Sequence, residues 1–224
     1  TGRTESAREK FNRALELKPD CAQAMFYLGE ISLNESDKAS AERHFNAATH
    51  ADDELLGPNS RLAELALQAG RHKEARSYLI TELRLEPEDA HILTSVASMF
   101  LELDCEDYAV NALLTALDIN PDHADAHYLL GVVSALRQRY DDAEDFFKHT
   151  LTLCESHLGA LRDSTIINMA RGEPAAAQQR ISAALAAAPD QPHLKAIGRR
   201  VKLARFFHTT GKILARLKIR SDHK

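Results

Sequence analysis

The side chains best suited to chemistry in this sequence are a pair of histidines. His123 and His127 lie four residues apart, a spacing that could place two metal ligands on one face of a helix. His123 falls just before an expected helix start, however, and isolated motif matches of this kind are often false. We therefore interpret the pair as capping or solvated histidines and predict no metal there.

A short acidic run is the second candidate for a cation site. It consists of Asp141, Asp142, Glu144 and Asp145. These acids lack the spaced ligands of a calcium loop. They fall in the first turns of an expected helix, where negative charge is stabilised by the positive end of the helix dipole. The dipole explains the run, so no metal is predicted here either.

The cysteines and the catalytic motifs give no sign of an active site. Cys21, Cys105 and Cys154 are an odd, widely spaced set, unlike a disulfide framework or a zinc site. We expect free thiols in a reducing compartment, and hence a cytoplasmic protein. The sequence has no nucleophile elbow, no glycine-rich phosphate loop and no paired-histidine zinc motif. The prediction is a non-catalytic protein that uses no cofactor.

The composition is that of a folded chain with an aliphatic core. Of 224 residues, 44% are hydrophobic and 27% are charged, which is typical of globular proteins and not of disordered ones. Tryptophan is absent and 6% of residues are aromatic, so Leu, Ala, Ile and Val must build the core. No apolar run approaches the roughly 20 residues of a membrane helix, and the first residues lack a secretory apolar stretch.

Charge is unevenly distributed along the chain. Residues 192–224 hold ten Lys or Arg and one acid, a net charge of +9. The remaining residues hold 18 basic and 32 acidic side chains, a net charge of −14. Such an asymmetry suggests that the two parts have different partners.

A recurring phrase predicts the elements that position these residues. Residues 14–20 read ALELKPD and residues 116–122 read ALDINPD, and related versions lie at 82–88 and 184–190. Their prolines are Pro19, Pro87, Pro121 and Pro189. The two outer intervals between these prolines are each twice the central one. A fixed period of about 34 residues is the sequence signature of a repeat architecture.

Other residue types recur in phase and divide each unit into two helices. Small residues recur ten and 22 positions after each proline slot, and large apolar residues recur 26 positions after it. We expect the small residues where two helices approach closely and the large ones where a side chain fills the gap. In the best-formed unit the helices are expected at about 125–137 and 141–153, with apolar residues at helical spacing.

Turn and cap residues fall at consistent places in this pattern. Gly70 and Gly172 fit the turns between paired helices, because glycine adopts positive φ at no steric cost. The prolines should end the second helices. The residues expected to cap the following helices are Asp20, Asp122 and Asp190.

This pattern resembles the tetratricopeptide repeat family. The resemblance rests on AHYLLG at 126–131, RYDDAEDFF at 139–147 and ALDINP at 116–121, and it extends over residues 7 to about 191. It implies an all-α fold: a right-handed superhelical solenoid of antiparallel helix pairs, with about five repeats of this period and a C-terminal capping helix. Within a domain at 1–191, units are expected at 22–55, 56–89, 90–123, 124–157 and 158–191. Residues 5–17 fit the second helix of an earlier unit, so we expect a fragment or a lone capping helix.

In solenoids of this family the first helices line a concave groove, and this implies which side chains face a ligand. The groove residues so implied are Phe26, Tyr27, Glu30, Arg61, Glu64, His91, Asp125, Tyr128, Arg162 and Asp163. The two tyrosines are amphipathic anchors of the kind that binding sites favour. The two arginines could each clamp a carboxylate bidentately. The alternative is that these are solvated faces whose aromatic residues pack between units.

Some family members bind the C-terminal carboxylate of chaperones through Lys and Asn residues in the groove. At the corresponding positions of this chain, only Arg61 and His91 could contribute. We therefore argue against that specialised activity.

Residues 192–224 have three interpretations. In the first, a helix over 192–208 caps the last repeat, a break follows at 208–211, and a short basic helix covers 212–220. In the second, the segment binds an anionic partner such as nucleic acid, a membrane surface or an acidic protein. A third possibility is that it docks on the acidic array of its own chain. The basic residues that would make these contacts are Arg199, Arg200, Arg205, Lys212, Arg216 and Lys218.

Together these features predict a protein interaction scaffold or adaptor that binds a peptide or protein segment in its groove. A preformed surface of this kind loses little ordering entropy on binding. Self-association is a further option, because exposed terminal repeats can pair. One rival hypothesis is the accessory repeat region of a larger enzyme of transferase or hydroxylase type. Another is an adaptor that acts through its basic C-terminal helix.

Overall fold

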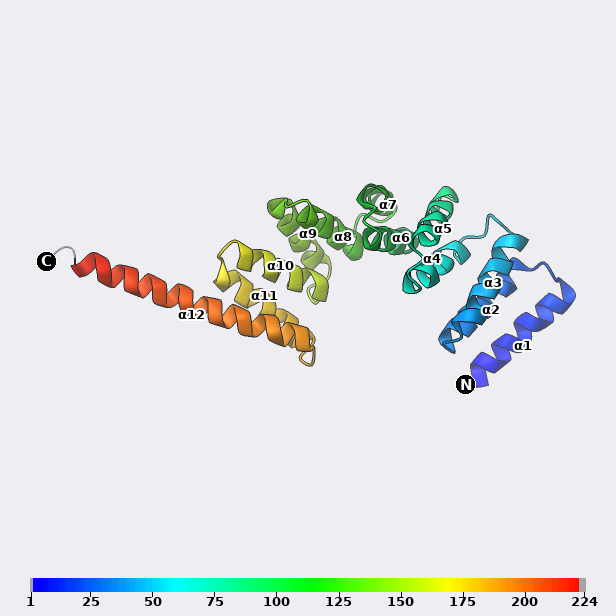
Figure 1. Ribbon diagram of the computed structural model, residues 1–224, viewed down its shortest axis with the longest axis horizontal. Helices are drawn as coiled ribbons and strands as arrows, with labels where there is room; N and C mark the ends of the chain where they lie inside the picture. Colours follow the sequence, from blue (N-terminus) through cyan, green and yellow to red (C-terminus); the bar gives the residue numbers. More distant parts are fainter. Residues whose placement is uncertain (1, 222–224) are drawn as a thin grey trace. The chain divides into compact units, whose positions relative to one another are not determined.

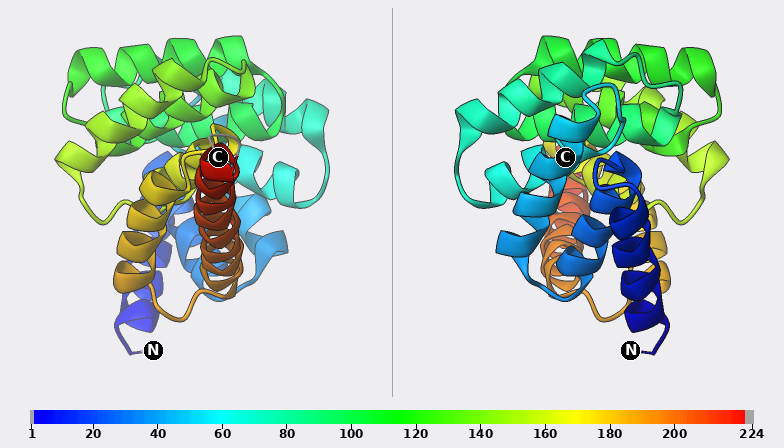
Figure 2. Two further views of the ribbon diagram at one scale, coloured as in Figure 1. Left: turned by 90° about the vertical axis from the view of Figure 1, so that its left-hand side faces the viewer. Right: turned by 90° about the vertical axis from the view of Figure 1, so that its right-hand side faces the viewer.

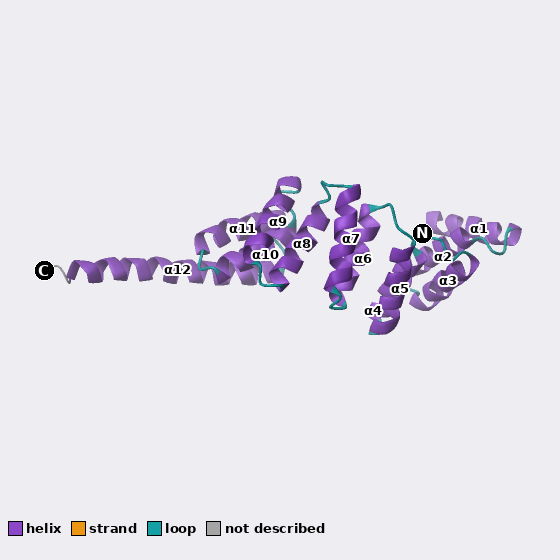
Figure 3. Cartoon of the chain, turned by 90° about the horizontal axis from the view of Figure 1, so that it is seen from above, coloured by secondary structure: helices purple, strands orange, loops and turns teal. Residues whose placement is uncertain are grey.

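The computed structural model describes the backbone of residues 2–221 and the side chains of residues 4–206. Over the described backbone the chain forms twelve helices and no strand, joined by short loops (Figures 1 and 3). From α1 to α7, and again from α8 to α12, consecutive helices pack on one another in sequence order. The fold is an all-α helical repeat solenoid, which confirms the predicted fold class.

The helices belong to two compact units, residues 1–121 and residues 122–224. The first unit contains α1 (Gly2–Leu17), α2 (Ala22–Asn34), α3 (Lys38–Ala51), α4 (Pro58–Gln68), α5 (His72–Arg84), α6 (Ala90–Glu102) and α7 (Glu106–Ile119). The second unit contains α8 (Ala124–Leu136), α9 (Tyr140–Leu153), α10 (Leu158–Ala170), α11 (Pro174–Ala187) and α12 (Pro192–Ser221).

Within each unit the helices pack as pairs. The first unit pairs α2 with α3, α4 with α5 and α6 with α7, and the second pairs α8 with α9 and α10 with α11. At the two ends of the chain, α1 lies beside α2, and α12 lies beside α11 (Figure 2). The exact repeat boundaries given above stay a prediction, with one helix pair expected in each.

The two helices of each pair are joined by the same turn. Its central residue has left-handed backbone geometry, with φ between 54° and 72°. The five residues in this position, one in each repeat, are Ser36, Gly70, Asp104, Gln138 and Gly172. The N–H of the following residue bonds to a carbonyl five positions earlier, as from Arg139 to Ser134 at 2.8 Å, and so satisfies a carbonyl at the helix end. The predicted turn glycines are confirmed, and three more turns lack a glycine.

A small residue against a large one sets the spacing within a pair. A Cβ added to Gly131 on α8 would lie 2.6 Å from Cε1 of Phe147 on α9, and one added to Gly29 would lie 2.4 Å from Cε1 of Phe45. Both phenyl rings are fully buried. The expected close approach of the paired helices is confirmed, since only the absence of a Cβ leaves room for the rings.

The predicted helix caps were placed one residue too early. Asp20 and Asp122 precede the N-caps of α2 and α8, and α12 begins two positions after Asp190. The N-cap of α8 is His123, whose Nδ1 accepts a hydrogen bond from the Ala126 N–H at 3.3 Å. The aspartates lie in the preceding turn, which is why the cap falls to the next residue. The capping interpretation of His123 is confirmed.

The C-terminal helix differs from its prediction. Over its described backbone α12 runs without a break from Pro192 to Ser221, so the break expected at 208–211 is wrong. A helix interior tolerates a glycine at a cost of only about 1 kcal/mol, so Gly211 does not end the helix. The first part of α12 packs on α11 through buried Leu194 and Val201. With 30 residues against 14 in α11, α12 extends past its partner (Figure 1).

Helix α4 takes its N-terminal cap from another helix. Its N-cap is Gly57, which has no side chain. Glu82 on α5 supplies the acceptors instead: Oε1 accepts from the Gly57 N–H at 2.7 Å, and Oε2 from the Ser60 N–H at 3.3 Å. Glu82 is fully buried, and this burial raises its pKa in spite of the opposing effect of the N–H donors. One buried carboxyl therefore fixes the start of α4.

The repeated turn predicts opposite effects for two reciprocal substitutions. A residue with a Cβ in the left-handed region carries a cost of roughly 1–2 kcal/mol. Gln138→Gly should therefore stabilise the chain and Gly172→Gln should destabilise it, each by about 1 kcal/mol. Nothing lies within 4 Å of a Cβ built on Gly172, so backbone conformation alone is tested there. Urea unfolding followed by circular dichroism measures the free energy of unfolding of both variants. Changes of the same sign in the two variants would contradict this account.

Replacement of the buried carboxyl predicts a loss of stability that depends on pH. Glu82→Ala leaves two N–H groups without their acceptors, which should lower the free energy of unfolding by about 2–3 kcal/mol. The exposed control Glu88→Ala should change it by less than about 0.5 kcal/mol. Because folding raises the pKa of Glu82, its contribution is complete at acid pH and declines as pH rises through the folded-state pKa. The loss of unfolding free energy caused by Glu82→Ala should therefore become smaller as pH rises, as measured by urea titrations at several pH values. A loss that grows with pH would refute this assignment.

Candidate functional site

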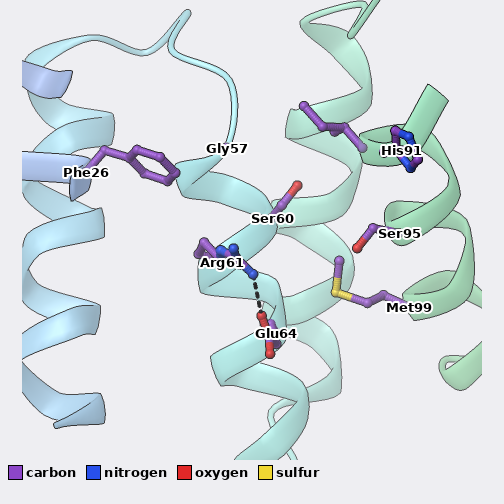
Figure 4. A pocket seen from close by; sticks show the side chains of 9 residues that line it. Phe26, Gly57, Ser60, Arg61, Glu64, His91, Ser95 and Met99 are labelled. Carbon is purple, nitrogen blue, oxygen red and sulfur yellow. Dashed lines mark hydrogen bonds and ion pairs between the residues drawn. The ribbon is translucent and has the colours of Figure 1, made fainter. Parts of the chain in front are cut away.

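A pocket of about 280 Å³ lies on the first unit, between α2, α4 and α6 (Figure 4). The residues that line it are Phe26, Gly57, Ser60, Arg61, Glu64, His91, Ile92, Ser95 and Met99. Four of them are groove residues named from the sequence: Phe26, Arg61, Glu64 and His91. Apart from Gly57, which precedes α4, every lining residue lies on the first helix of a pair.

The α2 side of the pocket is an aromatic wall fixed by packing. The ring of Phe26 lies 5.7 Å from that of Phe45, measured between centroids. It also lies against Gly57, where an added Cβ would come within 3.1 Å of Cζ. Gly57 has φ of 106°, a conformation that favours glycine. On the α6 side, Met99 is buried and Ile92 is half-buried, so the pocket has apolar groups on two sides.

Arg61 is already bound by two acids of its own chain. Its Nε and Nη2 donate to the two carboxylate oxygens of Glu30 at 2.7 and 3.0 Å, and its Nη1 donates to Oε2 of Glu64 at 3.1 Å. Burial lowers the pKa of Arg61, but the bonds and charges of Glu30 and Glu64 outweigh burial, and the pKa is raised. Three of the five N–H donors of the guanidinium are therefore engaged within the chain, and its role as a clamp on a ligand carboxylate stays a prediction.

Tyr27 on α2 packs on the neighbouring helix α1. Its ring stacks on Phe11 of α1, with centroids 5.1 Å apart and planes 16° apart. The side chain remains 46% exposed but does not line the pocket. Packing between neighbouring helices, the alternative interpretation, describes this tyrosine.

The expected groove residues of the second unit form a closed network. Arg162 donates from Nε and Nη2 to the two oxygens of Asp163 at 2.6 and 2.9 Å, and the hydroxyl of Tyr128 donates to Asp163 at 2.9 Å. Burial, followed by the charge of Asp163, raises the pKa of Tyr128 to about 12. Hydrogen bonding to Asp163 raises the pKa of Arg162 above its ordinary value. The fork of this arginine is also occupied.

His157 joins the same network and was missed in the sequence. Its Nδ1 accepts from the Ala160 N–H at 3.1 Å and caps α10, and its Nε2 lies 2.9 Å from Oδ1 of Asp125. Its ring also packs on Tyr128, with centroids 4.7 Å apart. The available signal was its position, one repeat after His123.

The basic C-terminal candidates are only partly described. Arg199, Arg200 and Arg205 are exposed on α12. The side chains of Lys212, Arg216 and Lys218 lie outside the described residues. Near the described arginines, Leu203 is 57% exposed and Phe206 is 62% exposed.

The two candidate cation sites are explained by other contacts. His127 packs edge-on against His149, with ring centroids 4.2 Å apart. Glu144 of the acidic run is buried and accepts a hydrogen bond from the Ser164 hydroxyl at 2.8 Å. Among the described residues no group of three His, Cys, Asp or Glu could hold a metal ion.

None of the described helices is both long enough and apolar enough to cross a bilayer.

Similar proteins were found by sequence. Over 157 residues the chain is 26% identical to protein O-mannosyl-transferase TMTC1 of Homo sapiens. The aligned region covers 68% of this chain and 18% of that protein. Over 158 residues it is 23% identical to superkiller complex protein 3 of Mus musculus. The aligned region covers 70% of this chain and 10% of that protein. The chain thus spans less than a fifth of the length of either relative.

Similar proteins were also found by structure. YrrB, a tetratricopeptide repeat protein with an unusual peptide-binding site, aligns with a TM-score of 0.68 and 16% identity, over 87% of this chain and 98% of its own. The type IV pilus biogenesis factor PilW aligns with a TM-score of 0.73 and 19% identity, over 87% of this chain and 90% of its own. A tetratricopeptide repeat protein of Parabacteroides merdae aligns with a TM-score of 0.72 and 18% identity, over 92% and 81%. These similarities concern the fold.

A family model described as tetratricopeptide repeat matches residues 1–54 and 107–155. The matched segments include helices from both units, and the turn at positive φ recurs in every helix pair. The family match and the structural similarities support a tetratricopeptide repeat family protein.

Proposed function

We propose that this chain is a non-catalytic scaffold or adaptor that binds a segment of a partner protein in the pocket between α2, α4 and α6. Tetratricopeptide repeat proteins in general are protein-interaction scaffolds, which supports this class of function. The observation that carries the proposal is the pocket itself, formed by the first helices of three consecutive pairs. The peptide-binding site of the structurally similar YrrB supports the same choice of ligand.

The size of the pocket is sufficient for a peptide side chain. Sites for drug-sized molecules are usually about 300–1,000 Å³ and enclose most of the ligand. This pocket, at about 280 Å³, lies just below that range. A partner segment would insert a side chain here and lay its remaining residues along the adjoining helices.

The charged groups of the pocket favour binding over catalysis. A catalytic acid or base must be directed at a substrate. Arg61, Glu30 and Glu64 are directed at one another, and Ser95 and Met99 complete a surface of mixed polarity. Because Phe26 and Arg61 are held by packing and ion pairs, the pocket is preformed, and binding would cost little ordering entropy.

An accessory role in a larger enzyme is the second candidate. The match to protein O-mannosyl-transferase TMTC1 favours it, because that relative extends well beyond the matched part. In this case the solenoid would present a partner or substrate protein to a catalytic domain of transferase type. Sequencing the native transcript tests it: an open reading frame that continues into a catalytic domain would support this role, and one without such a domain would exclude it.

Binding of an anionic membrane or nucleic acid through α12 is a third candidate. Exposed Arg199 and Arg200 near exposed Leu203 and Phe206 favour it. The test is binding to anionic vesicles and to an oligonucleotide at two salt concentrations, with an Arg199→Glu, Arg200→Glu variant. Binding that is absent, insensitive to salt or unchanged in the variant would eliminate this candidate.

A cytoplasmic location stays a prediction. It rests on Cys21, Cys105 and Cys154, which are free thiols. Thiols of this kind persist in reducing compartments.

Blocking the pocket should abolish peptide binding. Short peptides selected from a random display library on the intact chain would be labelled, and their affinities measured by fluorescence anisotropy. Ser95→Trp places a large ring in the pocket from an exposed position, and should weaken binding by tenfold or more, roughly 1.4 kcal/mol. Thr115→Trp, at an exposed position on α7 outside the pocket, is the matched control and should bind normally. Failure to select any peptide that Ser95→Trp weakens would count against the proposal.

A further inference from the structure

We infer that the pocket between α2, α4 and α6 selects a cationic residue, the Lys or Arg of a partner segment, and rejects acidic segments. This inference rests on the proposed function and names the chemistry of its ligand. It reverses the expectation from the sequence, in which Arg61 would attract a carboxylate. The reason lies in the neighbours of Arg61.

The positive charge of the pocket is more than neutralised from within. Arg61 contributes one positive charge, and Glu30 and Glu64 contribute two negative charges within 3.1 Å of it. An acidic ligand would have to displace Glu30 from a bidentate pair or approach a cluster of net negative charge. Both alternatives are unfavourable, since like charges brought together across an interface oppose association.

The two acids retain room for a cationic ligand. A carboxylate offers about four acceptor positions. Glu30 receives two hydrogen bonds, both from Arg61, and Glu64 receives one from Arg61 and one from Gln68 at 3.3 Å. The side chain of Glu64 is 43% exposed, so its remaining acceptor positions are accessible from the pocket. An ammonium or guanidinium group could bind there without breaking an existing bond.

The apolar walls match the stem of a basic side chain. Lys and Arg carry three or four methylene groups before the charge, and these groups pack well on apolar surfaces. Phe26, Ile92 and Met99 supply such a surface, and Glu64 lies on the same pocket (Figure 4). The face of Phe26 could in addition attract the cation of the ligand. A long basic side chain therefore fits this pocket, with its apolar walls and acidic end, better than a purely apolar side chain does.

The charge of the whole unit acts in the same direction. Residues 1–121 contain 12 Lys or Arg and 22 Asp or Glu, a net charge of −10. A unit with this charge attracts basic segments and slows the approach of acidic ones at low salt. The field of the unit and the local cluster at Arg61 thus favour the same class of partner.

The composition of selected peptides tests this inference. Random peptides would be selected on the intact chain and on a Glu30→Gln, Glu64→Gln variant. In the variant, Arg61 loses both negative partners and the cluster changes from net −1 to net +1. The intact chain should enrich Lys or Arg next to apolar residues, and the variant should enrich Asp or Glu. The affinity of a basic peptide, measured by anisotropy, should fall at least tenfold in the variant.

Two further variants keep the test decisive. Glu88→Gln with Glu102→Gln removes the same charge from exposed positions outside the pocket, and should keep the preference for basic peptides. Glu64→Gln alone changes one half-exposed residue and should give an intermediate loss if the double variant fails to fold. Enrichment of acidic peptides by the intact chain, or an unchanged basic preference in the double variant, would overturn the inference but not pocket binding. Absence of any peptide weakened by Ser95→Trp would instead overturn the proposed function.

Discussion

The left-handed residue in the turn between paired helices is the constraint on which the rest of this structure depends. It reverses the chain within a few residues and brings the second helix back along the first. Once the chain is reversed in this way, a glycine such as Gly131 can face a ring such as Phe147 at a distance that no Cβ would permit. The same turn recurs once in each helix pair, and in each pair the second helix packs back on the first. The pocket between α2, α4 and α6 follows from this repetition.

The chemical character of the pocket comes from contacts between pairs and not from the repeat itself. Arg61 on α4 reaches back to Glu30 on α2 and also holds Glu64 one turn along its own helix. In the second unit, Arg162 reaches back to the hydroxyl of Tyr128 on the preceding first helix at 3.1 Å and pairs with Asp163. Both arginines that the sequence suggests as ligand clamps thus form hydrogen bonds within the chain. The charge left over after their pairing determines what each surface can attract.

The fold was largely predictable from the sequence, because it depends on period and residue size. The regular period, the turn glycine Gly172 and the contact between Gly131 and Phe147 all follow from patterns that a single sequence displays. The left-handed conformation of Gln138 did not follow, because its residue type does not require positive φ and the surrounding helix pair imposes it. The pairing of Arg61 with Glu30 also could not be predicted from the sequence. Glu30 belongs to the preceding helix pair, and the contact depends on how the two pairs pack.

The buried carboxyl of Glu82 links the two helices of its pair in a way that bears on dynamics. The first turn of α4 is completed only when α5 has returned across it, since the acceptors for Gly57 and Ser60 come from residue 82. Opening of α5 would expose both amide groups to solvent at once. Hydrogen exchange at these two amides would then report the joint opening of α4 and α5, not the fraying of a single helix end. Because α4 also carries Arg61 and Glu64, the lifetime of the pocket is linked to that opening.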